Sequence, residues 1–437
     1  MPGKNINKGW LALSPLAFFV VAYAGVALSV GDAYSVPIAV IFLATCLYAT
    51  VVVARGSVQE RIAVLSSGAG SADVLLMIWV FALAGAFTAT AKAMGCVNAT
   101  VGVLLNILPD NALLPGLFVA ACLVSFSIGT SVGTVVALVP IAAGLAQFSP
   151  VAHAVPITVA AVVGGAFFGD NLSFISDTTV VATSTQGCNM KDKFKANAMI
   201  TVPVAVIVVT LYAFVPLFPD ELQVPAPTSA DILLVAPYLL VVLLAVVGVH
   251  VLVVLTLGVI VTGLVGGLFG SFTLLSYMES IGQGMLDMGE LILVSLLAGG
   301  LLKTVEQAGG IDFVVQRLSH RLRGKRSAEL AMGGLVSLVD VCTANNTIAI
   351  LTVGGICKRM ATVFGIDKRR SASLLDTFSC CMQGLLPYGA QVMMAAGLAA
   401  LNPMEIIPHL YYTFLLIIAL LLAIAFRYPR RLTDTTT

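Results

Sequence analysis

The sequence predicts an all-α polytopic membrane protein of two inverted repeats of five transmembrane helices plus one re-entrant hairpin each, with discontinuous helices at the midplane. Three observations lead to this fold class. The 437 residues are 59% hydrophobic and only 10% charged, with a mean hydropathy of +1.04, far from the averages of soluble domains. Several apolar runs are long enough to cross a bilayer. The two halves of the chain also align with each other.

The apolar runs predict several membrane crossings. A helix needs about 20 mainly apolar residues to span the hydrocarbon core. Three runs reach this length without one formal charge: Trp10 to Gly31, Ala33 to Ala54 and Ala196 to Pro219. The net charge of +1 and the short basic clusters beside apolar runs exclude a nucleic-acid partner. Membrane lipid is therefore the expected surrounding of the chain.

The basic residues predict the orientation, because Lys and Arg concentrate in the cytoplasmic loops of membrane proteins. Connections that lack Lys and Arg, around Asp32, Pro219 to Ser229 and Ser271 to Gly284, are expected outside. The sequence thus predicts a multi-pass protein of the cell (inner) membrane with cytoplasmic N- and C-termini. The six basic clusters are Lys4 with Lys8, Arg55 with Arg61, Lys191 to Lys195, Arg317 to Arg326, Lys358 to Arg370, and Arg427 to Arg431.

Two stretches fit re-entrant hairpins better than single crossings. Ala112 to Ala146 would measure roughly 52 Å as a straight helix, yet both of its ends are expected outside. Ser327 to Cys357 has basic clusters on both sides, so it is expected to enter and leave from the cytoplasm. The two hairpins are therefore expected to point at each other.

The chain repeats itself at a spacing of roughly 210 residues. Asp73 to Asn98 aligns without a gap with Asp287 to Asp312, with Gly85 matching Gly299. The predicted repeats are residues 1–219 and 230–437, within one integral-membrane domain. Because each half has an odd number of crossings, the second copy is expected to be inverted, which is typical of secondary transporters.

The segment from Gly169 to Thr179 places polar chemistry inside an apolar run. It reads GDNLSFISDTT and contains Asp170 and Asp177. Burying one Asp at the centre of a spanning helix costs about 2.5 to 3.5 kcal/mol on insertion scales. Two Asp residues in one apolar run therefore favour a functional site. Gly169 weakens the helix, and hydroxyls with freed carbonyls can replace the water shell of a small cation. The predicted ligands are Asp170, Asn171, Ser173, Ser176, Asp177 and Thr178, with Asp170 and Asp177 as the Na+ ligands.

Further polar residues lie at the two hairpin tips and at a second predicted break. The tips read SIGTSVGT and CTANNT, and the second break follows from Gly384, Pro387 and Gly389. Helix ends at such breaks attract ions and carboxylates of opposite charge. Helix packing is the competing interpretation for the small residues of the first tip, and pairing with Arg369 or Arg370 for Asp376. These candidates are Thr130, Ser131, Thr134, Asp340, Thr343, Asn345, Asn346, Thr347, Asp376, Gln383 and Gln391.

The run GAFFGDNLSFISDTT, followed by Lys191-Asp192-Lys193, resembles the NhaC-type sodium/proton antiporter family of the ion transporter superfamily, whose pattern here reads like GDKxSPLSDTT. The resemblance spans nearly the whole chain and implies that the matching Asp, Ser and Thr residues bind the ion. It also implies a homodimer. Asn171 stands where the family often has Lys, and Phe174 where it often has Pro.

These observations predict a secondary active transporter, in the first instance a Na+/H+ antiporter in which Na+ and H+ compete for buried Asp carboxylates. The alternative is a Na+- or H+-coupled transporter of an amino acid or small organic acid, held at the CTANNT tip. Na+ and H+ are expected as transported or coupling ions, with no other cofactor. The nucleotide-binding motif GxxxxGK[ST] and the zinc-peptidase motif HExxH are absent, so an enzyme is not expected.

Overall fold

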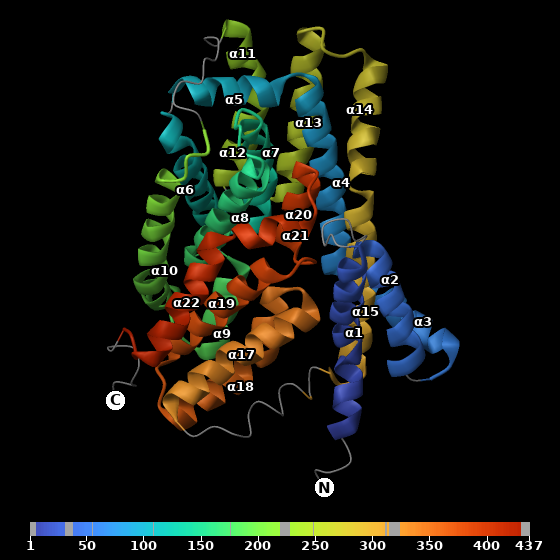
Figure 1. Cartoon of the computed structure of the whole chain (residues 1–437), viewed down its shortest axis with the longest axis vertical. Helices are drawn as coiled ribbons and strands as arrows, with labels where there is room; N and C mark the ends of the chain where they lie inside the picture. The colour runs from blue at the N-terminus through green and yellow to red at the C-terminus, as the bar shows by residue number, and fades with distance from the viewer. Residues whose placement is uncertain are drawn as a thin grey trace.

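In the computed structural model, every described element is a helix (Figure 1). The structure describes residues 6–30, 38–54, 56–107, 109–174, 176–218, 228–247, 249–310, 313 and 324–429. Parts of the predicted cytoplasmic clusters, at residues 4, 55, 317–323 and 430–431, lie outside the described residues. So do residue 32 and most of the predicted outer connection at residues 219–229.

The first half of the chain forms a series of apolar helices and a π-helical turn. Its elements are α1 (Ile6–Val30), α2 (Ile38–Tyr48), η1 (Ala49–Val53), α3 (Val58–Ala69), α4 (Ala72–Ala93), α5 (Cys96–Ile107), α6 (Asp110–Ile128), α7 (Ser131–Ala146), α8 (Ala154–Leu172), α9 (Asp177–Gln186) and α10 (Met190–Ala213). In Figure 1, α5 lies across the top of the molecule, beside the upper ends of α4 and α6.

The second half has the same kind of elements. They are α11 (Ser229–Leu234), α12 (Ala236–Val246), α13 (Val251–Leu268), α14 (Leu274–Asp287), α15 (Gly289–Gln307), α17 (Lys325–Thr343), α18 (Asn346–Phe364), α19 (Lys368–Leu385), α20 (Ala390–Ala399), α21 (Pro403–Ile406), η2 (Ile407–His409) and α22 (Tyr411–Ala425). In Figure 1, α17 and α18 lie low in the molecule, and α6 and α7 lie higher.

Six helical stretches are long and apolar enough to cross a membrane, and up to eight if each of two bent pairs counts as one span. Five shorter apolar helices of 10–17 residues accompany them in the described part of the chain. The chain is therefore a multi-pass membrane protein. The finer prediction of five crossings per repeat stays a prediction.

One predicted connection is wrong. Residues 271 to 284 were expected to link two crossings outside the membrane, but most of them belong to α14. Ser, Gln, Glu and Gly lower the hydropathy of this segment, whereas its apolar residues still share a helical face. That pattern suits a helix packed against a neighbour, and α14 packs on α4.

Each predicted hairpin is a pair of helices joined by a short turn, and each turns at a residue in the left-handed region, whereas the re-entry of the hairpins into the membrane stays a prediction. Gly129, with φ of 73°, ends α6 before α7 begins, and Ala344, with φ of 48°, ends α17 before α18. Glycine takes this conformation without strain, whereas Ala344 is held in it at some energetic cost. The tips are therefore tightly shaped rather than open loops.

Glycines bring four helices into backbone contact. A Cβ atom on Gly85 of α4 would lie 2.1 Å from the carbonyl oxygen of Gly284 in α14, and one on Gly68 of α3 would lie 2.3 Å from that of Gly299 in α15. Gly85 and Gly299 are the positions that align between the two halves of the sequence. Each of these two aligned glycines therefore contacts a glycine of another helix, whereas the internal repeat itself stays a prediction.

Glycines also set the position of α8 against α6. Cβ atoms at Gly165 and Gly169 would lie 2.4 Å and 2.5 Å from the carbonyl oxygens of Phe118 and Cys122. The helical stretch that contains α8 and α9 is largely buried inside the protein. Gly169 was expected only to weaken the helix, but it also lets α8 approach α6 closely, next to Asp170.

Candidate functional site

Two helix breaks near the middle of the bundle carry the candidate site. α8 ends at Leu172 and α9 begins at Asp177, while α19 ends at Leu385 and α20 begins at Ala390. Both breaks lie where the sequence predicts them, the second around Pro387. A break leaves carbonyl groups of one helix and N–H groups of the next without partners inside the helix. Polar backbone groups therefore face the space between the segments.

The two breaks and the two hairpin tips surround one cavity of about 310 Å³. The sequence predicted its polar residues from four separate segments, and the structure brings most of them together. Those that line the cavity are Thr130, Ser131, Asp170, Ser176, Asp177, Thr178, Asn345, Asn346, Thr347, Gln383 and Gln391. The candidates that do not line it are Thr134, Asn171, Ser173, Asp340, Thr343 and Asp376.

Four helices begin at this cavity. The first residues of α7, α9, α18 and α20 are all among its lining. Each helix N-terminus carries a partial positive charge of roughly half an elementary charge, which favours negative groups between them. Asp170 and Asp177 supply negative charge at this place, so the cavity combines anionic side chains with positive helix ends.

Asp170 is the carboxylate with the most developed surroundings. Its side chain is only 5% exposed. The hydroxyl of Ser131 donates to Oδ2 at 2.8 Å, and that of Ser176 donates to Oδ1 at 2.6 Å. Gln391 Nε2 in turn donates to the Ser131 hydroxyl at 2.9 Å. The first hairpin tip and both breaks therefore meet at this one carboxylate.

Asp177 differs from Asp170 in its exposure. It is the first residue of α9 and is exposed where it lines the cavity. Its neighbours Ser176 and Thr178 share a hydrogen bond of 2.9 Å between their hydroxyls. The two Asp residues were predicted to be equivalent Na+ ligands, but of the two only Asp170 is buried.

The first tip also fits the pattern GxSxG of serine hydrolases, from Gly129 to Gly133. That motif requires a turn between a strand and a helix, which exposes the serine as a nucleophile. Here the turn joins two helices, and the Ser131 hydroxyl donates a hydrogen bond to Asp170. The geometry of this tip therefore differs from that of a serine nucleophile.

The second tip uses its Asn pair partly to hold its own backbone. Asn345 Oδ1 accepts from the N–H of Ile348 at 3.0 Å and caps α18, and Asn346 Oδ1 accepts from the N–H of Thr347 at 3.1 Å. Gln383 Nε2 donates to the carbonyl of Ala344 at 3.1 Å. These bonds tie the tip to the second break while both Asn side chains still line the cavity.

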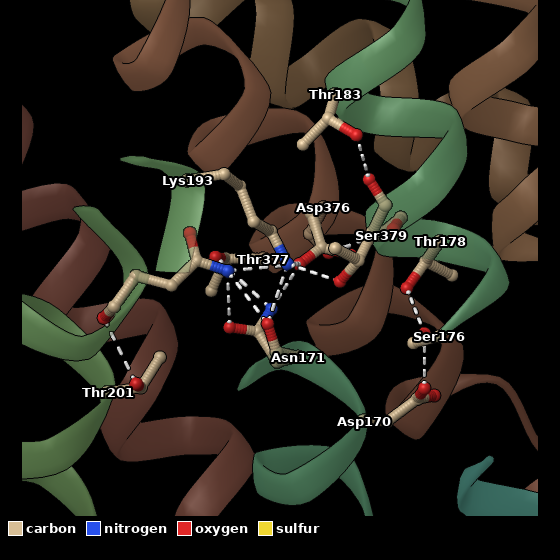
Figure 2. A network of polar contacts seen from close by, with 12 residues as sticks. Asp170, Asn171, Ser176, Thr178, Thr183, Lys193, Thr201, Asp376, Thr377 and Ser379 are labelled. Carbon is tan, nitrogen blue, oxygen red and sulfur yellow. Dashed lines mark hydrogen bonds and ion pairs between the residues drawn. The ribbon is translucent and has the colours of Figure 1, made fainter. Parts of the chain in front are cut away.

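A second polar cluster lies beside the cavity, around Asp376 (Figure 2). Lys193 Nζ contacts Asp376 Oδ2 at 2.5 Å, and Asn171 Nδ2 donates to the same oxygen at 3.0 Å. Asn197 Nδ2 donates to it as well, at 3.0 Å. The Lys193 and Asp376 side chains are 1% and 0% exposed. This ion pair joins α10 of the first half to α19 of the second half.

Lys193 was not among the predicted site residues, because residues 191–195 were assigned to a cytoplasmic cluster. A helical stripe could have revealed it: Lys193, Asn197 and Thr201 recur every four residues and are all buried along α10. Polar residues at that spacing within an apolar helix share one face. That face turns towards Asn171, next to the first break, and towards Asp376 of α19.

The alternative prediction, that Asp376 pairs with Arg369 or Arg370, is wrong. Arg370 pairs with Glu329 at 3.3 Å, and Arg369 with Asp367 at 2.6 Å. Residues six positions apart on a helix do not share a face, unlike those three or four apart. Arg370 and Asp376 therefore point to different neighbours.

The remaining candidates are buried or lie at the tips. Asp340 of α17 is fully buried, and neither carboxylate oxygen has a hydrogen-bond partner among the described residues. The Thr134 hydroxyl donates to the Thr130 carbonyl at 3.1 Å, and that of Thr343 to the Asn345 carbonyl at 3.2 Å. Ser173 is buried directly after α8.

Two larger cavities lie beside the site. One of about 620 Å³ shares Met77, Ala344, Asn345 and Ile348 with the site cavity and extends to Lys303 and Glu306. The other, of about 970 Å³, lies between α4, α14 and α20 and carries the charged side chains Lys92, Asp287, Glu290 and Glu405. Only the first of these two borders the second hairpin tip.

The ligand set suits an alkali cation better than a transition metal. Among the described residues, no group of three or more His, Cys, Asp or Glu side chains comes close enough to hold a metal ion. The atoms around Asp170 are carboxylate and hydroxyl oxygens, which hard cations prefer. These residues thus fit Na+ or a proton.

Comparisons with known proteins give one family match and several similar proteins. The sequence profile of the Na+/H+ antiporter family matches residues 6–217 and 224–428. The Na+/H+ antiporter NhaC of Bacillus subtilis is 26% identical over 391 residues, which are 81% of this chain and 84% of that protein. The malate-2H+/Na+-lactate antiporter of the same organism is 22% identical over 396 residues, or 82% and 81%.

A solved structure is similar at lower identity. The YdaH transporter of Alcanivorax borkumensis matches 90% of this chain and 99% of its own, with 15% identity and a TM-score of 0.42.

Proposed function

This chain belongs to the Na+/H+ antiporter family, and we propose that it exchanges Na+ for H+ across the cell (inner) membrane, with Asp170 binding either ion. The observation that carries this proposal is the burial of the Asp170 carboxylate beside a cavity, with a hydroxyl on each of its oxygens. An unpaired charge inside a membrane protein is costly and marks ion pathways.

The two ions exclude each other at one carboxylate. An ionised Asp170 offers the charge and oxygens that hold Na+, and the Ser131 and Ser176 hydroxyls can add their own oxygens by rotating. A protonated Asp170 has lost that charge, so it cannot hold Na+ equally well. Competition of this kind couples the movement of Na+ to that of H+. Asp177, at the exposed edge of the cavity, would help to attract the cation.

Alternating access is proposed to follow from the inverted repeats 1–219 and 230–437. Each half presents a hairpin followed by a broken helix in the same order, and the glycine contacts of Gly85 and Gly299 occupy matching positions. Repeats of this kind move against each other around a fixed site in many transporters. We propose that the chain ends and the cavity of about 620 Å³, which extends to Lys303, lie on the cytoplasmic side. The reason is that basic clusters flank the second hairpin.

The test of this function is Na+-driven proton movement in everted membrane vesicles. Asp170→Asn removes the only charge from the buried carboxylate while nearly keeping its size, so exchange is expected to fall to that of vesicles without the protein. Asp177→Asn is expected to raise the Na+ concentration needed for half-maximal exchange. Glu279→Gln is the control, because Glu279 is exposed on α14 and lines neither the site cavity nor the two cavities beside it. Full exchange by Asp170→Asn would overturn the proposal.

A second candidate function is supported by the cavity and one relative. About 310 Å³ is room for roughly ten water molecules, which exceeds the need of one Na+. Four helix N-termini also favour an anionic group there. The cavity would then take a small organic acid or amino acid together with the ion, as the name of the malate-2H+/Na+-lactate antiporter says of that relative. Counterflow of labelled acids in liposomes tests this, and no uptake under a Na+ gradient would dismiss it.

A further inference from the structure

The ammonium group of Lys193 is surrounded by oxygen atoms. Besides Asp376 Oδ2 at 2.5 Å, Lys193 Nζ contacts the Asn171 carbonyl oxygen and the Thr179 hydroxyl, each at 2.6 Å. These three oxygens come from α19, from the C-terminal end of α8 and from α9. Three separate segments that adjoin the two helix breaks therefore converge on one positive charge.

These oxygens are also the ligands of a sodium site. Carboxylate, hydroxyl and backbone carbonyl oxygens bind hard cations, and carbonyls at the C-terminal ends of broken helices coordinate Na+ in transporters. Two further buried oxygens, Asp376 Oδ1 and Asn197 Oδ1, have no hydrogen-bond partner among the described residues. The cluster thus contains more oxygen atoms that could bind a cation than the ammonium group contacts.

We propose that this cluster is a second cation site, which the chain fills with its own ammonium group. Lys193 is then a tethered cation that takes the place of a mobile Na+ at Asp376, so only the site at Asp170 exchanges its ion. This assignment rests on the proposed function for the identity of the mobile ion. It predicts that the number of Na+ ions bound is limited by Lys193.

A purely structural ion pair would behave differently when Lys193 is shortened. Removing one partner of a buried pair leaves a charge without compensation and destabilises the fold, whatever salt is present. A cation site instead becomes vacant and is refilled by Na+. The dependence of stability and binding on Na+ therefore separates the two roles.

The experiment measures Na+ binding to the purified full-length protein, with choline chloride replacing NaCl at constant ionic strength. Binding is followed by 22Na+ at saturation and by the Na+ dependence of the thermal unfolding midpoint. The wild type is expected to bind about one Na+ per protein, and Lys193→Ala about two. Lys193→Met, which fills the space without a charge, is expected to gain no second ion.

A double variant makes this result independent of the Asp170 site. Asp170→Asn alone is expected to bind no Na+, whereas Asp170→Asn with Lys193→Ala is expected to bind about one. If the wild type binds none while Lys193→Ala still gains one, the proposed function fails and the second site stands. If Lys193→Ala binds no more Na+ than the wild type, and the double variant binds no more than Asp170→Asn, the second site is overturned.

Folding of Lys193→Ala is itself a readout. The variant is expected to give folded protein in Na+ and much less in choline, because Na+ replaces the missing ammonium group. Removing both charges, in Lys193→Ala with Asp376→Asn, should abolish this dependence on Na+. An equally low yield of Lys193→Ala in both salts would identify the pair as structural and overturn the proposal.

Discussion

At the scale of single residues, the surroundings of Asp170 would decide how strongly it holds the ion that we propose for it. Its two oxygens each accept a hydroxyl hydrogen bond, and Ser131 is itself held by Gln391. Such a chain fixes the orientation of the carboxylate towards the cavity. Asp177 has an exposed position at the start of a helix, so the role proposed for it is to attract the ion rather than to enclose it.

Ser131→Ala tests this arrangement. Hydrogen bonds to charged groups contribute about 1.5 to 3 kcal/mol, so loss of the hydroxyl as donor and ligand should raise the Na+ concentration for half-maximal exchange by about tenfold or more. The everted-vesicle assay measures this directly. Ser127→Ala is the matched control on the same hairpin, because its hydroxyl donates within its own helix, to Leu123 at 2.8 Å. Unchanged Na+ dependence of Ser131→Ala would remove this tip from the ion site.

The residues that the sequence identified are those whose position in an apolar run is costly without a function. Asp170 and Asp177 interrupt such a run and were found for that reason. Lys193 was not, because a lysine near a predicted span end is ordinarily explained by topology. The stripe of Lys193, Asn197 and Thr201 indicates one polar face of α10, but no local pattern states that this face meets α19. The pairing of Asp376 with Lys193 required the three-dimensional arrangement.

At the scale of elements, the hairpins and breaks follow from local chemistry, whereas helix packing does not. Pro alone does not stop a helix here, because α7 continues through Pro140. The polar run SIGTSVGT and the group Gly384, Pro387 and Gly389 interrupt apolar segments, so the first tip and the second break were predictable. α14 was not predictable, because its polar residues lower the hydropathy of the segment. Its apolar face is explained only by its packing against α4. The role of Gly169 in close packing likewise depends on α6.

Gly284→Ala tests the contact between α14 and α4. The added Cβ would lie 2.3 Å from the carbonyl oxygen of Gly85, so the helices must separate, at a cost of about 1 to 3 kcal/mol. The midpoint of thermal unfolding in detergent should fall accordingly. Gly282→Ala is the matched control in the same helix: nothing lies within 4 Å of its Cβ position, and Ala favours the helix over Gly by roughly 0.5 to 1 kcal/mol. Equal midpoints for the two variants would contradict the close approach.

At the scale of the whole molecule, the site lies where the two halves of the sequence meet. The first half supplies Asp170 and Lys193, and the second half supplies Asp376, Gln383 and Gln391. Movement of one half against the other would therefore change both the ion site and its access. The cavities of about 620 Å³ and 970 Å³ beside the site are the two candidate routes, and only the former shares lining residues with the site cavity.

Thiol labelling distinguishes these routes. Cysteine is introduced at Ser67 or at Ser280, which line the smaller and the larger of these cavities, in a protein without its eight native cysteines. With cytoplasmic chain ends, a reagent that cannot cross membranes should label the Ser67 position in everted vesicles and the Ser280 position in intact cells. Bound Na+ is expected to change the labelling rate at Ser67, because that cavity adjoins Asn345 at the site. Labelling of both positions from the same side would contradict the orientation and the alternating routes together, whereas retained antiport shows that each variant is correctly folded.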